Sequence, residues 1–513
     1  MAIKTEIIAT IVVLGLPVAA RAQAISRIAD NLSERYSRPE AIFEANPAAM
    51  TFMRSYSLSD ISLGADIIHS DEAHTVQEGT GLTDFSAMAL SYMHLNASTT
   101  VWGYAGYATG KRSDVAWNNS ADYRLVAPYV IGDSVGGDLT HRQYEFGGGY
   151  AGVHGPWGWG AEATFRAAFD YRNRDPRDKI IVSDLNIKLG GTRRLGATYT
   201  VGLGASIRVY NQESDVEFFN PVNEIRAYPL TGLGSTYARF SGNSKFDTAY
   251  KGFGYGASLQ LFPAQGSGWM ASLEWRQMDI RQVLRAYNNL ELTTNAQTAL
   301  SARIVRPLSL GRLTLSPTLS GRYAHRNGDE NIFGTAVGNN YPQIGSRRNY
   351  KLTEIEASLS VLLSLRLGDA QAASPIRNEL EMIPSASYCL SDQQLIQPSR
   401  QLKAAALTPG LGAGVRLVRP KWLLRIAATG SYRSASEQTR RLDGLDPERS
   451  LTQATIHNFD MLTANATTLG GNADLYIALK DGITLRIAAS ARSTTYDGHG
   501  HGWGMNLRAG VVF

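Results

Sequence analysis

Apolar and polar residues alternate along most of the chain with a period of two, which is typical of β-strands. The clearest example is the last stretch, WGMNLRAGVVF (503–513), where Trp503, Met505 and Leu507 begin a series of apolar residues on one parity. Such a strand has one apolar and one polar face. Because an exposed apolar strand promotes aggregation, we expect another surface to cover it.

The same alternation recurs in segments of about ten residues separated by turn-rich links. Examples are WGWGAEATFRAAFDY (157–171), YTVGLGASIRVY (199–210) and GITLRIAASAR (482–492). Short links alternate with long polar ones, as they do in outer-membrane barrels with short periplasmic turns and long outer loops. Only a closed barrel satisfies the backbone of every strand in lipid. We therefore predict an all-β fold: a closed antiparallel transmembrane β-barrel of about 18 strands, within a range of roughly 14 to 18.

Aromatic residues support the assignment of the short links to the periplasmic side. Barrels carry aromatic girdles at both membrane interfaces. Five of the eight tryptophans follow the predicted periplasmic turns, namely Trp102, Trp157, Trp159, Trp269 and Trp422.

The two ends of the barrel are predicted to pair with each other. SYSLSDISLGADII (55–68) is the candidate first strand, and it would cover the last strand. The terminal Phe513 resembles the C-terminal signal that the barrel assembly machinery reads in outer-membrane proteins. This resemblance implies that the assembly machinery is a partner of the chain, and the barrel prediction makes outer-membrane lipid another.

The first residues resemble a secretory signal peptide. Residues 1–22 contain Lys4, an apolar run and small residues before Ala22, and the run is shorter than the about 20 residues that a spanning helix needs. A cut after Ala22 leaves residues 23–54 as a periplasmic or lumenal segment and 55–513 as the barrel. The only cysteine, Cys389, excludes an intrachain disulfide. The net charge of +5 is too small and dispersed to indicate binding of nucleic acid.

RPEAIFEANPAAMTFM (38–53) resembles the N-terminal NPA-containing segment of the long-chain fatty acid transporter superfamily. Asn46, Pro47, Ala48 and Ala49 carry this resemblance. It implies an N-terminal segment folded into the barrel, and it leaves open a transporter of hydrophobic ligands. The sequence as a whole looks like the uncharacterised outer-membrane barrels of Bacteroidota-type bacteria. Residues 26–37 are either a short amphipathic helix or a disordered periplasmic tail.

Side-chain parity in the last strands predicts a basic wall of the lumen opposed only by Asp474. Its members are Arg416, Arg425, Arg433, Lys480, Arg486, Arg492 and Arg508. In an open barrel this wall would favour anions, because a narrow lumen focuses the field of its lining charges. Alternatively, the arginines pair across the lumen with acidic residues. Earlier strands mix both signs, with Glu162, Asp170, Glu274, Glu354, Glu356, Arg166, Arg208, Arg276, Arg322 and Arg366.

Barrel closure would also bring the first and last outer loops together. Imidazole and carboxylate groups are ligands for zinc, copper, nickel or iron, so these loops form a candidate divalent-metal site at the outer rim. The alternative is a set of solvated polar loop tips. The candidate ligands are His69, Asp71, His74, Asp497, His499 and His501, with Glu72 nearby.

No cofactor is certain, and catalysis is disfavoured because no nucleophile, base and orienting group fall into a recognisable arrangement. A plugged receptor of the TonB-dependent type is disfavoured because residues 23–55 are too few for its plug. We therefore expect an outer-membrane channel or uptake protein for a small solute, and the basic wall and the metal candidate favour an anionic or metal-associated one. The alternative is a plugged barrel that serves as a structural or assembly platform for a surface or periplasmic protein partner.

Overall fold

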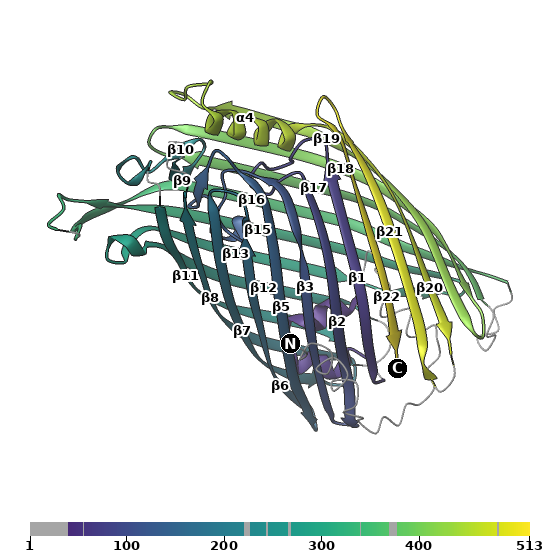
Figure 1. Ribbon diagram of the computed structural model, residues 1–513. Coiled ribbons are helices and arrows are strands. Elements are labelled where there is room, and N and C mark those ends of the chain that lie inside the picture. The colour runs from purple at the N-terminus through teal and green to yellow at the C-terminus, as the bar shows by residue number, and fades with distance from the viewer. Residues whose placement is uncertain are drawn as a thin grey trace, which may run out of the picture.

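The computed structural model describes residues 39–513, apart from residues 55, 220–225, 243–244, 265–267, 339, 369–376 and 480–481. Within these residues the chain forms a closed antiparallel barrel of 18 strands, as the alternation predicts (Figure 1). The predicted signal peptide, residues 26–37 and Lys480 lie outside the described residues.

The barrel strands follow one another around the wall in chain order. They are β1 (Leu58–Ser70), β2 (Gly81–Asn96), β3 (Thr99–Val115), β5 (Gly137–His154), β6 (Trp157–Tyr171), β7 (Arg177–Leu195), β8 (Tyr199–Glu217), β11 (Lys245–Pro263), β12 (Met270–Leu284), β13 (Leu290–Val305), β15 (Leu313–Phe333), β16 (Gln343–Leu367), β17 (Arg377–Leu395), β18 (Arg400–Val418), β19 (Trp422–Arg441), β20 (Ala466–Ala478), β21 (Thr484–Tyr496) and β22 (Gly500–Val512). The short strand β14 (Leu308–Leu310) pairs with β15 beyond the end of β13.

Other elements lie inside or at the ends of this wall. A small separate sheet contains β4 (Ile131–Asp133), β9 (Ala227–Gly232) and β10 (Ser235–Thr236). The helices are η1 (Pro39–Ala45), η2 (Pro47–Phe52), α3 (Tyr123–Val126), η3 (Ala238–Phe240), η4 (Arg285–Tyr287) and α4 (Ser450–Thr463). No helix in the described ranges has both the length and the apolar character needed to cross a membrane.

The first and last strands close the barrel. Strand β1 pairs with β22 from Asp60 opposite Val512 to Ser70 opposite Gly502. The backbone of Phe513 extends this ladder, because its N–H donates to the Ser59 carbonyl and its own carbonyl accepts from the Ser59 N–H. The predicted pairing of the two ends is therefore confirmed, and it leaves the apolar terminal strand without a free edge.

Large apolar side chains project outward around the barrel. On β8, Leu203 is 64% exposed, and Ile207 and Val209 are also exposed, whereas the intervening residues point into the lumen. An outward apolar surface on a closed barrel requires a lipid environment.

The predicted aromatic girdle is confirmed for four of its five tryptophans. Trp157, Trp159, Trp269 and Trp422 are exposed next to short turns. The prediction for Trp102 is wrong, because its indole N–H donates to Glu162 Oε2 inside the barrel at 2.9 Å. Trp102 has the parity of the lumen face of β3, which a count of residues after a turn does not reveal.

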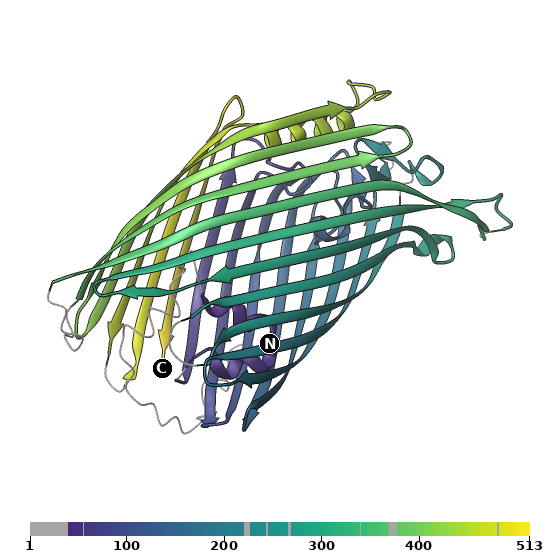
Figure 2. The ribbon, with the colours of Figure 1, turned by 180° about the vertical axis from the view of Figure 1, so that it is seen from behind.

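The two ends of the barrel differ. Figure 1 places the C-terminus and the short turns at one end, and α4, β9 and β10 at the other. Seen from behind in Figure 2, η1 and η2 lie at the end that carries the C-terminus. Because periplasmic turns are short and outer loops long, η1 and η2 mark the periplasmic end and α4 the outer end.

Candidate functional site

The N-terminal segment closes part of the periplasmic end of the lumen. Asn46 is fully buried and caps η2, since its Oδ1 accepts a hydrogen bond from the Ala48 N–H at 2.9 Å. Its Nδ2 contacts the carbonyl oxygens of Gly191 and Leu203, both at 3.2 Å, and Gln260 Oε1 at 3.0 Å. One amide thus joins the segment to three neighbouring strands. The NPA segment lies in the lumen, as the sequence resemblance implies.

Glycines on the inner wall make room for this segment. A Cβ atom at Gly190 would lie 1.8 Å from Asn46 Oδ1, and one at Gly160 would lie 2.6 Å from the Ala48 nitrogen. Neither distance is possible for real atoms, so residues 46–48 fit only against a wall that lacks side chains at these positions. The inner wall at Gly160 and Gly190 therefore forms a recess that fits segment 39–54, and we call this recess the dock.

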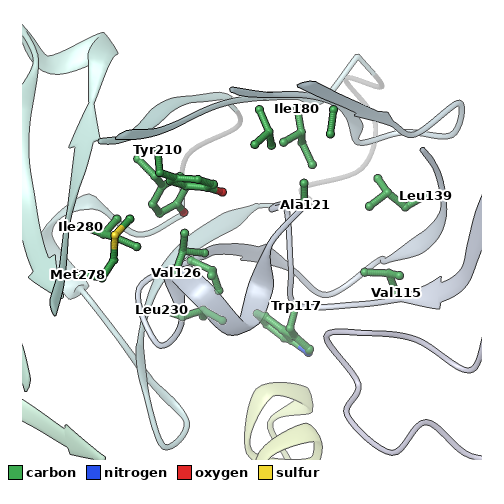
Figure 3. Packing of buried hydrophobic residues seen from close by; sticks show 14 of the residues in the cluster. Val115, Trp117, Ala121, Val126, Leu139, Ile180, Tyr210, Leu230, Met278 and Ile280 are labelled. Atoms are coloured by element: carbon green, nitrogen blue, oxygen red, sulfur yellow. The ribbon is translucent and has the colours of Figure 1, made fainter. Parts of the chain in front are cut away.

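At the outer side, a loop between β3 and β5 folds into the lumen. We call residues 116–136 the lumen loop. Its strand β4 pairs with β9, so two outer loops are joined inside the barrel mouth. Figure 3 shows Val126 of the lumen loop beside Tyr210 and toward Met278 and Ile280 of the wall, and Ala121 beside Ile180. The lumen loop is therefore packed against the wall by a hydrophobic cluster.

Charged groups hold one side of the lumen loop to the wall. Arg166 of β6 approaches Asp122 at 2.5 Å, and the Tyr210 hydroxyl donates to Asp122 Oδ2 at 2.8 Å. Asp184 of β7 lies 3.4 Å from Arg166 and accepts two hydrogen bonds from Arg208 of β8, at 2.8 and 2.7 Å. These ion pairs and hydrogen bonds therefore connect β6, β7 and β8 to the lumen loop.

The opposite side of the lumen loop is held by β13 and β15. Asn295 Nδ2 donates to the Ala127 carbonyl at 2.9 Å. The buried Arg326 guanidinium donates to the same carbonyl and, at 2.9 Å, to the Arg124 carbonyl. The lumen loop therefore contacts the barrel wall from β6–β8 to β13–β15.

Two adjoining cavities extend from the outer loops toward segment 39–54. The larger, of about 1060 Å³, reaches from α4 and the first outer loop past the lumen loop. The smaller, of about 340 Å³, ends at Ala45 of η1. The residues that line both cavities are Arg166, Asp184, Arg208, Glu274, Arg276 and Met278. The two cavities thus meet along the wall between β6 and β12, and the larger one also touches the strands from β13 to β19.

The lining of the larger cavity is strongly charged. Among the described residues it contains eight arginines and six acidic residues. The arginines are Arg112, Arg124, Arg166, Arg208, Arg276, Arg322, Arg326 and Arg433, and the acidic residues are Glu78, Asp122, Asp184, Glu274, Glu354 and Glu356. Burial raises the pKa of the Tyr123 phenol, and burial with the nearby Arg433 and Arg124 lowers the pKa of the His74 imidazole. Both groups are therefore uncharged at neutral pH.

The predicted basic wall is largely neutralised by its neighbours. Arg416 pairs with Glu379 at 3.0 Å, and Arg425 lies between Glu381 at 2.8 Å and Asp474 at 3.5 Å. Arg486 lies 4.0 Å from Asp60. The expectation that Asp474 alone opposes these arginines is thus wrong, because β17 and β1 also supply carboxylates on the same wall.

The remaining arginines of this wall have different surroundings. Arg433 donates to the carbonyls of Met461, Leu462 and Ala464 at the C-terminal end of α4. Arg492 and Arg508 face the lumen, and in the described part of the chain neither forms an ion pair. Six arginines predicted for this wall lie in the described part of the chain, and among them Arg433 alone lines the larger cavity.

The predicted metal ligands come close in space, but their side chains diverge. The Asp71 carboxylate accepts from the His501 backbone N–H at 2.9 Å. The His501 ring contacts Ser493, the His69 ring packs against Trp503 on the lipid side, and His74 lines the cavity. Asp497 donates its backbone N–H to the Asn465 carbonyl. The six predicted ligands therefore do not assemble around one point.

Several residues of the site escape sequence reasoning. Asp122 and Arg124 belong to a stretch that reads as a polar outer loop, and nothing in its composition places it inside the barrel. Arg112 and Arg326 lie near the outer ends of their strands, where the parity of the alternation is harder to assign. The strand-borne charges Arg166, Arg208, Arg276, Arg322, Glu274, Glu354 and Glu356 were predicted for the lumen, and they do line the cavity.

A closed barrel with an apolar outer surface and a polar, partly filled lumen defines an outer-membrane β-barrel protein. The chain belongs to a protein family of unknown function, DUF6850, whose model matches residues 47–513. No curated protein matches its sequence.

The chain also resembles several solved outer-membrane proteins at low TM-scores and low identity. A mutant ferric enterobactin receptor from Pseudomonas aeruginosa, in complex with enterobactin, has a TM-score of 0.39 and 8% identity, over 90% of this chain and 82% of that one. The ferric preacinetobactin receptor from Acinetobacter baumannii has a TM-score of 0.38 and 8% identity, over 88% and 80%. A bacterial polysaccharide outer membrane secretin has a TM-score of 0.34 and 11% identity, over 89% and 98%.

Proposed function

We propose that this protein takes up a small polar solute across the outer membrane through its own lumen. One observation carries the proposal: the two charged cavities adjoin, and together they extend from the outer loops to segment 39–54. A solute would enter beside α4, pass the lumen loop along the β6–β12 wall, and leave when segment 39–54 shifts. The lumen serves transport in this proposal, not catalysis.

The charged lining supports a polar solute more than a hydrophobic ligand of the kind that the NPA resemblance suggests. Arginines outnumber carboxylates in the larger cavity, which favours an anionic solute or one with an anionic group. Five of these eight arginines lie on β6, β8, β12 and β15, and Arg433 alone among the eight lies on the wall formed by the last strands.

Planar-bilayer recordings of the purified barrel test the proposal. An uptake path predicts small, stable current steps in the wild type, because the lumen is narrowed but not filled. The alternative is a platform barrel for a surface or periplasmic protein. That role predicts a barrel that remains silent in the wild type and in variants that loosen segment 39–54 or the lumen loop, and such silence would overturn the proposal.

A further inference from the structure

A cluster of two imidazoles and a carboxylate joins three outer segments of the chain. Glu72 belongs to the first outer loop, His457 to α4, and His499 to the turn between β21 and β22. Glu72 Oε2 lies 3.2 Å from His499 Nδ1 and 3.9 Å from His457 Nδ1. The two imidazole rings lie 6.3 Å apart between centroids and are nearly perpendicular. Both Nδ1 atoms thus face the same carboxylate oxygen.

We propose that Glu72, His457 and His499 bind a divalent transition-metal ion such as Zn²⁺. Two ligand atoms about 2 Å from one zinc ion lie at most about 4 Å apart. Both measured Nδ1 to Oε2 distances fall within this span. Two imidazoles with one carboxylate suit zinc, nickel or copper, and leave a position for water.

The surroundings of His457 match those of a metal-binding histidine. Its Nε2 contacts the Ala73 carbonyl oxygen at 2.7 Å. A backbone carbonyl at this nitrogen selects the tautomer that carries hydrogen on Nε2, and it leaves Nδ1 available as a ligand. This contact also fixes the orientation of the ring toward Glu72.

The site closes when the ion draws its ligands together. As the side chains stand, no three His, Cys, Asp or Glu groups of the described residues already surround one point. His499 lies between Gly498 and Gly500, whose φ angles are 80° and 81°. Glycines in this conformation let the exposed turn adjust without a steric penalty. All three side chains are partly exposed, so an ion can reach them from outside.

Bound metal would fasten α4 to the rest of the barrel mouth. Asn458, next to His457, already accepts a hydrogen bond from the Val76 N–H at 2.8 Å and donates one to Gln77 at 2.7 Å. Because α4 lines the larger cavity, an ion at this position would stiffen the outer edge of that cavity. The inference does not depend on what the lumen carries.

Isothermal titration of the purified full-length barrel with zinc chloride tests the site. We expect one zinc ion per barrel, a higher unfolding temperature with zinc, and no competition from Mg²⁺, which prefers oxygen ligands. The variants His457→Ala, His499→Ala and Glu72→Gln should each weaken zinc binding by about tenfold or more and abolish the thermal shift.

Matched controls come from the neighbouring histidines that point elsewhere. His69→Ala and His501→Ala should retain wild-type zinc affinity, because His69 packs on Trp503 and His501 contacts Ser493. Heat-modifiable migration on gels would establish that every variant forms the barrel. The proposal is overturned if the wild type binds no zinc, if the first three variants bind it normally, or if the two controls lose it equally.

Discussion

Arg166 Nη2 on the barrel wall lies 2.5 Å from Asp122 Oδ2 on the lumen loop. The same Asp122 oxygen accepts a hydrogen bond from the Tyr210 hydroxyl, so one carboxylate connects the lumen loop to β6 and β8. Asn295 and Arg326 hold the far side of the loop. The width of the path through the lumen therefore depends on contacts that single substitutions can remove.

Asp122→Ala should loosen the lumen loop and increase the current through the barrel. A hydrogen bond to a charged group contributes about 1.5–3 kcal/mol, which corresponds to an increase of about ten- to a hundred-fold in the population of the detached loop. Single-channel recording measures the open fraction. Glu448→Ala, at an exposed position in an outer loop, is the control and should behave as wild type. An unchanged current in Asp122→Ala would contradict the assigned role of this ion pair.

Gly190→Ala should displace the N-terminal segment from its dock. The added Cβ would lie 1.8 Å from Asn46 Oδ1, and overpacking of this kind costs about 1–3 kcal/mol. Limited proteolysis of the purified barrel should then cut segment 39–54 faster. Gly191→Ala is a matched control, since a Cβ there meets only the Gly158 carbonyl oxygen, at 3.8 Å. Equal cleavage of the two variants would contradict the dock.

Arg276→Gln should shift ion selectivity toward cations. The Arg276 side chain is 63% exposed, lies 2.5 Å from Glu274 and lines both cavities, so its removal leaves the Glu274 carboxylate uncompensated along the path. Arg492→Gln removes an arginine that faces the lumen but lies outside these cavities, and it should change the reversal potential less. Reversal potentials in a salt gradient compare the two. A larger shift in Arg492→Gln would indicate that the solute path follows the wall of the last strands instead.

Arg425→Ala should destabilise the barrel rather than change its selectivity. The Arg425 side chain is 3% exposed between Glu381 and Asp474, and its removal leaves two buried carboxylates without their shared partner. Removing one partner of a buried ion pair costs about 3–5 kcal/mol. Denaturant unfolding in detergent micelles should show this loss, with Arg492→Ala close to wild type. Equal midpoints for the two variants would mean that Arg425 is solvated.

The sequence predicts the wall of this protein better than its contents. Alternation assigns the lipid and lumen faces because a strand in a membrane barrel must present apolar groups to lipid, and the pairing of β1 with β22 follows from closure. The structure shows that His501 shares the outward parity of Trp503 and contacts Ser493, contrary to the expectation that it joins the other metal ligands. Alternation does not predict that residues 116–136 fold inward, because that position depends on tertiary partners such as Arg166 and Arg326.

The same difference between strand residues and loop residues holds for the candidate site. Strand-borne charges such as Arg208 and Glu274 are predictable as lumen residues, whereas Asp122 and Glu72 acquire their partners only through loop packing. Glu379 and Glu381 neutralise the basic wall from a strand whose inner face the sequence leaves unassigned. Local patterns therefore find residues that line the lumen, but not the contacts that narrow it.

The native Cys389 allows the most direct test of the proposed path. It is the single cysteine of the chain. It lies opposite Glu356 in the ladder between β16 and β17, and it lines the larger cavity. A small, charged, membrane-impermeant thiol reagent added to intact cells should modify Cys389 in the folded barrel, whereas a maleimide on a large polymer should not. If Cys389 reacts with the small reagent only after unfolding, the cavity is closed to the outside and the proposed uptake path is wrong.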